Sequence, residues 1–429
     1  MQYENSLSQN YSTMVSQLKV VHEGKELNLS QISKYMNHSD RKIRKQYNAL
    51  YDKAWLSIAK DLDELFDKLV KVRHEIALKT GFNNHTEYCF HKHGRTSYGR
   101  QELLVFSNNV ESFISPLVNE MYKTQEKNFG HEIFSYDENF FVNKIDLNTD
   151  KDLISSFKKI FQSLSPQTHV FYEELVDREM YDVGLRDGKL MGAYSNYMPL
   201  FSMPYIFESY NGSFGAINTF AHECGHGLNS FMHRGDVFLN KASSDVYESH
   251  SMSMEFFVWP YINNIINEEQ IPYYKYNKLR NALSFICYGT AIDQFQTMVY
   301  DKPEMTPEER LSLWKNLENR FLPWRKYESD GFNYQGRRWQ QQIHVMRWPF
   351  YYIDYVLAQV CALQFWLKDE KCHETAWEKY IMFIKNSGGM SFLELVNSAQ
   401  LKSPFNKESI IEISTSVKNY LDTVLNEVI

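Results

Sequence analysis

The chain has 429 residues, of which 43% are hydrophobic, so it can bury a large core and, by length, form two or three domains. Its 46 Lys and Arg residues face 53 Asp and Glu residues, and the net charge of -7 excludes the basic surface expected of a protein that binds nucleic acid or an anionic membrane. The N-terminus lacks the features of a signal peptide, and the cysteines are scattered without CxxC spacing, which predicts a cytoplasmic protein with reduced thiols and no membrane partner.

The first part of the chain is predicted to form successive amphipathic helices. Between Asp40 and Gly81, apolar residues recur every three to four positions, and Gly81 supplies a helix stop. A later helical stretch runs from Ser155 to Met180, with a break at Pro166. Because the sequence shows neither an internal repeat nor a low-complexity linker, we expect two interlocked regions, a helical N-terminal lobe over 1–130 and a second region over 131–429.

The helical pattern changes between Lys189 and Gly212. This segment is rich in Tyr, Phe, Gly and Pro, and it predicts two short strands joined by a turn near Pro199. The edge of a small sheet is suited to pair with an extended peptide. Tyr194 and Tyr197 are therefore candidate substrate-binding residues, although packing within the sheet would explain them equally well.

A helix predicted over residues 215–233 carries the run HECGH. Residues four apart lie on one face of a helix, so His222 and His226 can offer two imidazoles to one metal ion, with Glu223 beside them as general base. No other His-Glu pair in the chain has a second His at this spacing. Cys224 faces away from the metal position and is expected to pack beneath the helix.

A catalytic zinc ion usually needs a third protein ligand and an open position for water. The next predicted helix, over residues 243–260, offers Glu248 and Glu255, which lie two turns apart on one face. One of them can bind the metal while the other orients a ligand histidine, and the spacing alone does not decide which. His250 is a rival ligand, but it points to a different face of the helix.

Three sequence blocks together resemble one family of enzymes. HECGH, the later YESHSMSMEFF and HVMRWPFYYIDYVLAQ are similar to blocks of the M3 metallopeptidases, the thimet oligopeptidase and oligoendopeptidase F clan, and most closely to its oligoendopeptidase F branch. Weaker similarity extends through GRTSY and GAYSNYMP, so the resemblance covers nearly the whole chain. It implies a mainly α fold with a thermolysin-like HExxH zincin core, a small β-sheet, and helical lobes that flank a substrate channel.

The resemblance also implies roles for individual residues. It makes Glu248 the third ligand of one Zn²⁺ ion per chain and gives Glu255 the task of orienting a ligand histidine. It places His344 over the scissile carbonyl with Tyr352 and Tyr355, and the neighbouring Tyr351 is a further candidate for contact with substrate. Without the resemblance, His344 and these tyrosines are better explained as an aromatic helix face packed in the core.

The implied function is a zinc-dependent endopeptidase that hydrolyses short unstructured oligopeptides, with residues 131–429 as its catalytic region. Enzymes of the family that the chain resembles usually carry a further helical segment before the position of Met1, where it forms part of the channel wall, and by this comparison the chain looks shortened at its N-terminus. We therefore expect a more open channel, a homo-oligomer that completes it, or a dedicated peptide substrate. The alternatives are a peptide-binding protein that has lost turnover and a zinc enzyme that acts on a non-peptide amide.

Overall fold

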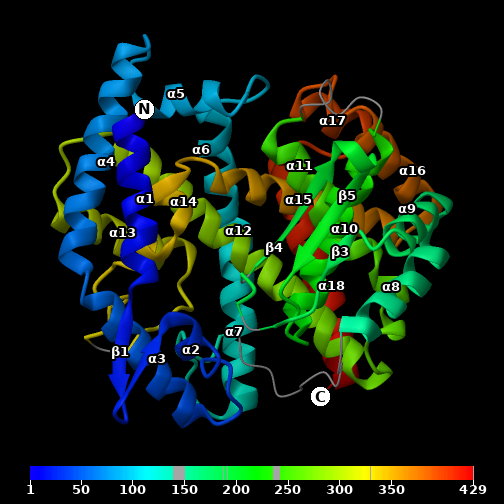
Figure 1. Ribbon diagram of the computed structural model, residues 1–429, viewed down its shortest axis with the longest axis horizontal. Helices are drawn as coiled ribbons and strands as arrows, with labels where there is room; N and C mark the ends of the chain where they lie inside the picture. The colour runs from blue at the N-terminus through cyan, green and yellow to red at the C-terminus, as the bar shows by residue number, and fades with distance from the viewer. Residues whose placement is uncertain (139–149, 187, 191, 235–241, 329, 429) are drawn as a thin grey trace. The chain divides into compact units, whose positions relative to one another are not determined.

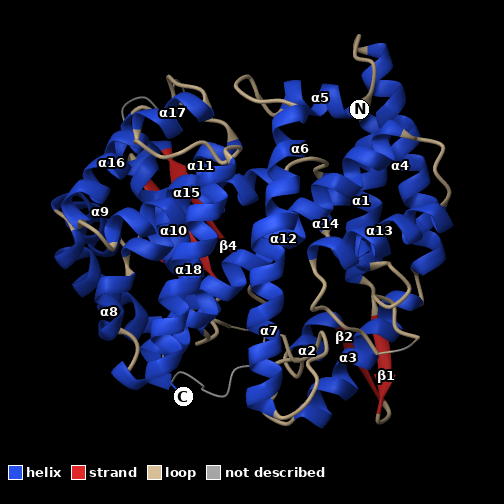
Figure 2. Ribbon diagram, turned by 180° about the vertical axis from the view of Figure 1, so that it is seen from behind, coloured by secondary structure: helices blue, strands red, loops and turns tan. Residues whose placement is uncertain are grey.

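The computed structural model describes residues 1–138, 150–186, 188–190, 192–234, 242–328 and 330–428. Helices make up most of this part of the chain and strands are few, as Figure 1 and Figure 2 show. This confirms the mainly α fold that the sequence predicts. Among the described residues, no helix combines the length and the apolar character needed to cross a bilayer.

The chain forms two compact units that are interleaved in sequence. Unit 1 comprises residues 1–94, 107–142 and 283–353, and unit 2 comprises residues 95–106, 143–282 and 354–429. Three of the boundaries fall inside helices, namely α6, α12 and α15. The division into 1–130 and 131–429 stays a prediction.

Unit 1 is built mainly from helices of the N-terminal third and of residues 283–353. Its elements are α1 (Gln2–Ser16), β1 (Lys19–His22), β2 (Lys25–Asn28), α2 (Leu29–Ser33), α3 (Arg41–Leu56), α4 (Ala59–Lys79), α5 (His85–Lys92), η1 (Val110–Ile114), α7 (Ser115–Phe129), α13 (Pro307–Phe321), η5 (Arg338–Gln341) and α14 (Ile343–Arg347), together with parts of α6 (Arg100–Asn109), α12 (Ile271–Asp301) and α15 (Tyr352–Asp369).

The expectation of helices alone in the first part of the chain was wrong at residues 19–28. There β1 and β2 pair as an antiparallel hairpin, with Lys19 opposite Asn28. The turn residues Glu23 and Gly24 both have positive φ, at 49° and 76°, as the tight turns that join hairpin strands require. The helical stretch between Asp40 and Gly81 is also divided, because α3 ends at Leu56 and α4 begins at Ala59.

Unit 2 contains the three-stranded sheet and the helices around it. Its elements are α8 (Asp150–Leu164), α9 (Pro166–Asp177), β3 (Tyr181–Asp182), β4 (Ala193–Met198), η2 (Pro199–Phe201), β5 (Met203–Glu208), α10 (Phe214–Met232), α11 (Ser244–Phe257), η3 (Trp259–Asn264), η4 (Glu268–Gln270), α16 (His373–Lys385), α17 (Phe392–Ser398) and α18 (Lys407–Val428), with the remaining parts of α6, α12 and α15.

The sheet of unit 2 has the strand order β3-β5-β4. Strands β4 and β5 pair antiparallel, with Ala193 opposite Glu208 and Met198 opposite Met203, which confirms the two strands and the turn predicted near Pro199. Strand β3, which the sequence did not predict, pairs parallel with β5. Helix α10 packs against β4 and β5, and the two strands lie across it in Figure 1.

The high aromatic content serves both cores. In unit 1 the ring centroids of Phe66 and Phe295 each lie 4.6 Å from that of Trp339, and all three side chains are buried. In unit 2 the buried rings of Phe157 and Phe220 meet edge to face at 4.7 Å, so that α8 packs against α10. Aromatic pairs at these distances add to the free energy gained by burying their surface.

Candidate metal centre

Helix α10 carries the two histidines and begins at a side-chain cap. Ser213 accepts a hydrogen bond from the amide of Ala216 at 3.2 Å, which satisfies one of the free N–H groups of the first turn. Cys224 is fully buried, as expected for the face opposite the two histidines. A Cβ atom at Gly227 would lie 2.8 Å from Cζ of Phe171, so this turn of α10 needs a glycine to pack against α9.

Helix α11 carries both candidate glutamates, and hydrogen bonds from two other elements fix it. Near its start, Asp245 accepts a hydrogen bond from the hydroxyl of Tyr98 at 2.9 Å. In its middle, the carbonyl oxygen of His250 accepts one from the hydroxyl of Tyr380, also at 2.9 Å. Tyr98 belongs to the GRTSY block, so this block supports the helix that presents Glu248.

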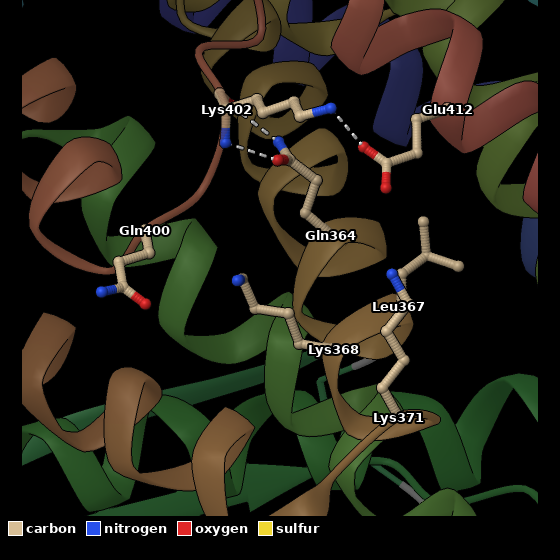
Figure 3. Close-up of a pocket in the computed structure, with 7 residues that line it drawn as sticks. All are labelled: Gln364, Leu367, Lys368, Lys371, Gln400, Lys402 and Glu412. Atoms are coloured by element: carbon tan, nitrogen blue, oxygen red, sulfur yellow. Dashed lines mark hydrogen bonds and ion pairs between the residues drawn. The ribbon is translucent and has the colours of Figure 1, made fainter.

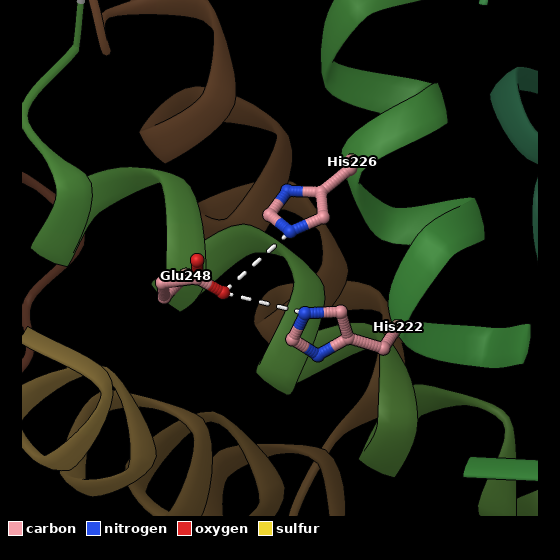
Figure 4. Close-up of side chains that lie close together, drawn as sticks. All are labelled: His222, His226 and Glu248. Atoms are coloured by element: carbon pink, nitrogen blue, oxygen red, sulfur yellow. Dashed lines mark ion pairs between the residues drawn. The ribbon is translucent and has the colours of Figure 1, made fainter. Parts of the chain in front are cut away.

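His222, His226 and Glu248 come together although the third residue lies on a different helix. One ligand atom from each lies within 4.8 Å of the other two. Oε2 of Glu248 is 3.3 Å from Nε2 of His222 and 3.5 Å from Nε2 of His226, and its carboxylate faces both rings in Figure 4. These side chains are between 8% and 19% exposed, so the group is largely but not completely shielded from solvent.

Glu255 lies beside this group and contacts His222 from its other ring nitrogen. Its Oε1 is 2.8 Å from Nδ1 of His222. Since a carboxylate only accepts hydrogen bonds, Nδ1 carries a proton, and Nε2 is the ring nitrogen that faces Glu248. A histidine held in this way is suited to bind a metal ion through Nε2.

Buried charges of opposite sign shift the pKa values of the group. Burial opposes the charged forms, but hydrogen bonds and charges from Glu248 and Glu255 raise the pKa of His222 to about 10. Burial also opposes ionisation of Glu248, yet hydrogen bonds from His222 and His226 hold its pKa well below the usual value. The carboxylate is therefore ionised and ready to bind a cation.

The donor set fits a zinc ion. Two imidazole nitrogens and one carboxylate oxygen are the ligands found at many catalytic zinc sites, where a fourth position is left for water or substrate. A carboxylate on the opposite nitrogen of a ligand histidine is the support that such sites usually have. The described part of the chain thus offers a group that can hold a metal ion, made of the two histidines that the spacing selects and the glutamate that the resemblance selects.

Glu223 is buried next to the two histidines. Burial raises its pKa, although the positive charges of His222 and His226 act against this. Its Oε2 atom has no hydrogen-bond partner among the described protein atoms. A buried carboxylate oxygen without a protein partner is available to a small polar molecule such as water.

Glu208 is a second buried carboxyl group near Glu223, and the sequence analysis did not select it. It ends β5 and is 2% exposed. Burial and the negative charge of Glu223 raise the pKa of Glu208 to about 8. The signal in the sequence was weak, because it consists of one acidic residue at an inward-facing position of an apolar strand.

His250, the rival ligand, is not part of the group of three. It is fully buried, and its ring lies 5.4 Å from the ring of Phe383 in an edge-to-face contact. Burial lowers its pKa well below the usual value, so the ring is neutral. The structure places it in the core of unit 2.

His344 lies in unit 1 and has an ordered environment there. The side-chain amide of Gln342 lies 2.6 Å from Nδ1 of His344. If the amide donates to Nδ1, the neutral ring carries its proton on Nε2 and can donate it. Gln342 is held in turn by the hydroxyl of Tyr288, which donates to its Oε1 at 3.1 Å.

Two of the three candidate tyrosines surround His344. The ring of Tyr351 is stacked with it at 5.9 Å, and the ring of Tyr352 lies 5.0 Å away. Burial raises the pKa of Tyr352, so its phenol stays protonated. Tyr355 is half-buried one turn further along α15, in the part of that helix that belongs to unit 2.

Tyr194 and Tyr197 both lie on β4, which is an edge strand of the described sheet. The ring of Tyr194 stacks on that of Phe207 at 4.9 Å and is 41% exposed. The hydroxyl of Tyr197 donates to the carbonyl of Arg234 at 2.9 Å. Tyr194 therefore offers an aromatic surface to solvent, whereas Tyr197 ties the strand to the end of α10.

A separate pocket of about 100 Å³ lies among α15, α18 and the segment at 400–402 (Figure 3). Its charged residues are three lysines and one glutamate, and Lys402 pairs with Glu412 at 2.8 Å. None of the candidate site residues lines it. The pocket is lined by Gln364, Leu367, Lys368, Lys371, Gln400, Lys402 and Glu412.

Comparison with known protein families gives one match over most of the chain. The sequence model of peptidase family M3 matches residues 34–415. A search of curated protein sequences gave no match.

Solved structures similar to the chain are peptidases. The structure of PZ peptidase A with an inhibitor has 33% sequence identity and a TM-score of 0.91, over 98% of this chain and 76% of that chain. A candidate oligoendopeptidase F has 34% identity and a TM-score of 0.91, over 98% and 75%. A candidate oligoendopeptidase F from Bacillus anthracis str. Ames has 33% identity and a TM-score of 0.85, over 98% and 74%.

Proposed function

Since the chain belongs to peptidase family M3 and is a metalloendopeptidase, we propose that it hydrolyses short unstructured oligopeptides with one Zn²⁺ ion held by His222, His226 and Glu248. The observation that carries this proposal is the convergence of the three side chains from α10 and α11, with Glu255 fixing the proton of His222. The names of the similar oligoendopeptidase structures support the choice of short peptides as substrates.

When bound, a zinc ion acts as a Lewis acid that lowers the pKa of a coordinated water to about 7. In the proposed mechanism Glu223 accepts a proton from the attacking water and later passes it to the leaving amine. The buried Oε2 atom of Glu223 has no described protein partner, which suits it to hold that water. Its raised pKa also brings the carboxyl group closer to the neutral range in which a proton shuttle works best.

Further donors are proposed for the oxyanion of the tetrahedral intermediate. His344 can donate from Nε2 when the side-chain amide of Gln342 donates to Nδ1. Tyr352 keeps its phenolic proton, and Tyr355 is the second candidate donor. Donors that are oriented before the reaction stabilise developing charge without a cost of reorganisation.

Substrate contacts are proposed for the edge strand and the aromatic residues near His344. An extended peptide can pair with β4, where Tyr194 presents its exposed ring. Tyr197 and Tyr351 are the other residues proposed to contact the substrate.

A cytoplasmic location and a homo-oligomer that completes the channel also stay predictions.

The test compares three proteins with a library of short peptides, analysed by mass spectrometry. Wild type with one equivalent of zinc should cleave, and a chelator should stop it. Glu223→Gln should keep the metal and the fold but lose cleavage, whereas Glu173→Gln, at a half-buried glutamate of α9, should behave like wild type. Normal cleavage by Glu223→Gln would refute the mechanism. Peptide binding without hydrolysis in zinc-loaded wild type would support the alternative of a peptide-binding protein.

A further inference from the structure

We propose that Lys278 is a positioning residue of the metal centre, and that it acts through Glu255 on His222. Lys278 lies on α12, outside every motif that the sequence analysis used. Its ammonium group holds the carboxylate of Glu255 in the orientation in which that carboxylate accepts the Nδ1 proton of His222. This inference rests on the proposed function, because its effect is read from the bound metal.

The two oxygens of Glu255 are divided between two partners. Oε1 lies 2.8 Å from Nδ1 of His222, and Oε2 forms an ion pair with Nζ of Lys278. A carboxylate is planar and rigid, so fixing one oxygen restricts the positions that the other can take. The chain of contacts therefore runs from Lys278 through Glu255 to the ring whose Nε2 faces Glu248.

The ion pair of Lys278 and Glu255 is largely buried, so each charge depends on the other for compensation. The side chains of Glu255 and Lys278 are 8% and 11% exposed. The negative charges of Glu223 and Glu248 belong to the same region, so an uncompensated Glu255 would add a further buried negative charge beside them. The positive charge of Lys278 offsets it, and together with the hydrogen bond from His222 it holds the pKa of Glu255 low despite burial.

Packing limits where the ammonium group of Lys278 can go. Nζ lies 5.3 Å from the ring centroid of Phe256, the neighbour of Glu255 on α11. A cation over an aromatic face is itself favourable, so this contact favours the position in which Lys278 meets Glu255. Among the described residues, the hydrogen-bonding partners of Glu255's side chain are His222 and Lys278.

A purely structural role makes a different prediction. If the ion pair only ties α12 to α11, its loss would lower the stability of the fold and leave the affinity for metal unchanged. If Lys278 positions Glu255, its loss weakens the hold on the metal, and this effect disappears once Glu255 no longer carries a carboxylate. A double-mutant cycle on metal affinity separates the two.

The experiment measures the dissociation constant for zinc by competition with a chromogenic chelator. Lys278→Met and Glu255→Gln should each weaken zinc binding by about 10- to 100-fold, the range found when a partner of a ligand histidine is removed. The double variant should be no weaker than Glu255→Gln alone. Lys278→Arg, which keeps the charge, should restore binding to within a few-fold of wild type.

Lys275→Met is the matched control, because Lys275 lies on the same helix with its ammonium group over the ring of Trp259. It should bind zinc like wild type. Unchanged zinc affinity in Lys278→Met, or a double variant whose loss is the product of the two single losses, would overturn the inference. If Lys278→Met does not fold, as judged by circular dichroism, Lys278→Gln replaces it.

The same titration distinguishes this inference from the proposed function. The metal centre itself would be contradicted if wild type bound no zinc, or if His226→Ala bound zinc as tightly as wild type. Wild type that binds zinc tightly while Lys278→Met binds it equally well would contradict only the role of Lys278.

Discussion

A Cβ atom at Gly225 would lie 2.6 Å from Cα of Ser251 and 3.1 Å from the carbonyl oxygen of His250. Helices α10 and α11 therefore touch backbone to backbone between the turn that carries the two histidines and the turn that follows Glu248. No other residue fits at this contact without moving one helix. The separation of the histidines from Glu248 thus depends on a glycine that is not itself a ligand.

Gly225→Ala is expected to push the two helices apart. Overpacking of a tight contact costs about 1–3 kcal/mol of stability, which exceeds the roughly 1 kcal/mol that alanine gains over glycine in a helix. The affinity for zinc should fall as well, because the contact at Gly225 sets the separation of the two histidines from Glu248. Gly215→Ala on the same helix is the control, since its Cβ would meet Ser213 Oγ at an ordinary 3.6 Å. Equal stability and zinc affinity of the two variants, measured by thermal unfolding and chelator competition, would contradict this account.

His344→Ala should lower kcat by about 100- to 1000-fold, the usual effect of removing one oxyanion donor. Zinc content and thermal stability should remain those of wild type, because His344 is not a proposed ligand. The measurement is steady-state cleavage of a peptide identified from the library. A variant with normal kcat would remove His344 from the mechanism.

Gln342→Leu should lower kcat through His344. The leucine cannot donate to Nδ1, so the hydrogen bond that favours the proton on Nε2 is lost. We expect a loss smaller than that of His344→Ala, and no further loss when both changes are combined. Additive losses in kcat would show that Gln342 acts in some other way.

The roles of Tyr351, Tyr352 and Tyr355 can be distinguished by variants that remove only the hydroxyl group. Tyr352→Phe and Tyr355→Phe should lower kcat if their phenols donate to the oxyanion. Tyr351→Phe should leave kcat near the wild-type value, because the ring stacked on His344 is retained. A large loss of kcat in Tyr351→Phe alone would move the role of donor to that residue.

Asp52 makes the stability of the protein depend on pH. Burial raises its pKa to about 6, although Arg338 and the amide of Phe332 lower it. Because the folded protein holds this proton more tightly than the unfolded chain, stability is lost as pH rises from about 4 through 6, by up to about 3 kcal/mol. Asp52→Asn cannot ionise, so its melting temperature should rise relative to wild type over this interval. A difference in melting temperature between Asp52→Asn and wild type that does not change over this interval would contradict the prediction.

The sequence predicts those parts of the site that follow from local spacing. His222 and His226 share one helix face, and β4 and β5 follow from alternating residues on either side of a proline-containing turn. The choice between Glu248 and Glu255 did not follow from spacing, because both lie on the same face of α11. In the structure Glu248 faces both histidines, and Glu255 contacts the far nitrogen of one of them.

The features that the sequence did not predict depend on distant contacts or on very short elements. Lys278 is one of many lysines on helices, and only the packing of α12 near α11 brings it to Glu255. Strand β3 is two residues long and is defined by pairing with Ile206 and Phe207 on β5, not by its own composition. The hairpin at residues 19–28 is similarly short, and its Glu-Gly turn is a weaker signal than Asn-Gly or Asp-Gly.

The interleaving of the two units has a consequence for biosynthesis. Unit 1 receives its last segment, 283–353, only after most of unit 2 has been translated, and unit 2 is completed by the final segment, 354–429. Neither unit has all of its residues until most of the other has been translated, so the helices that bear His222 and Glu248 must wait for residues of the segment 354–429 before the core of unit 2 is closed. A nascent chain stalled after Glu248 but before that point carries the ligands of the metal centre and lacks the finished scaffold that holds them.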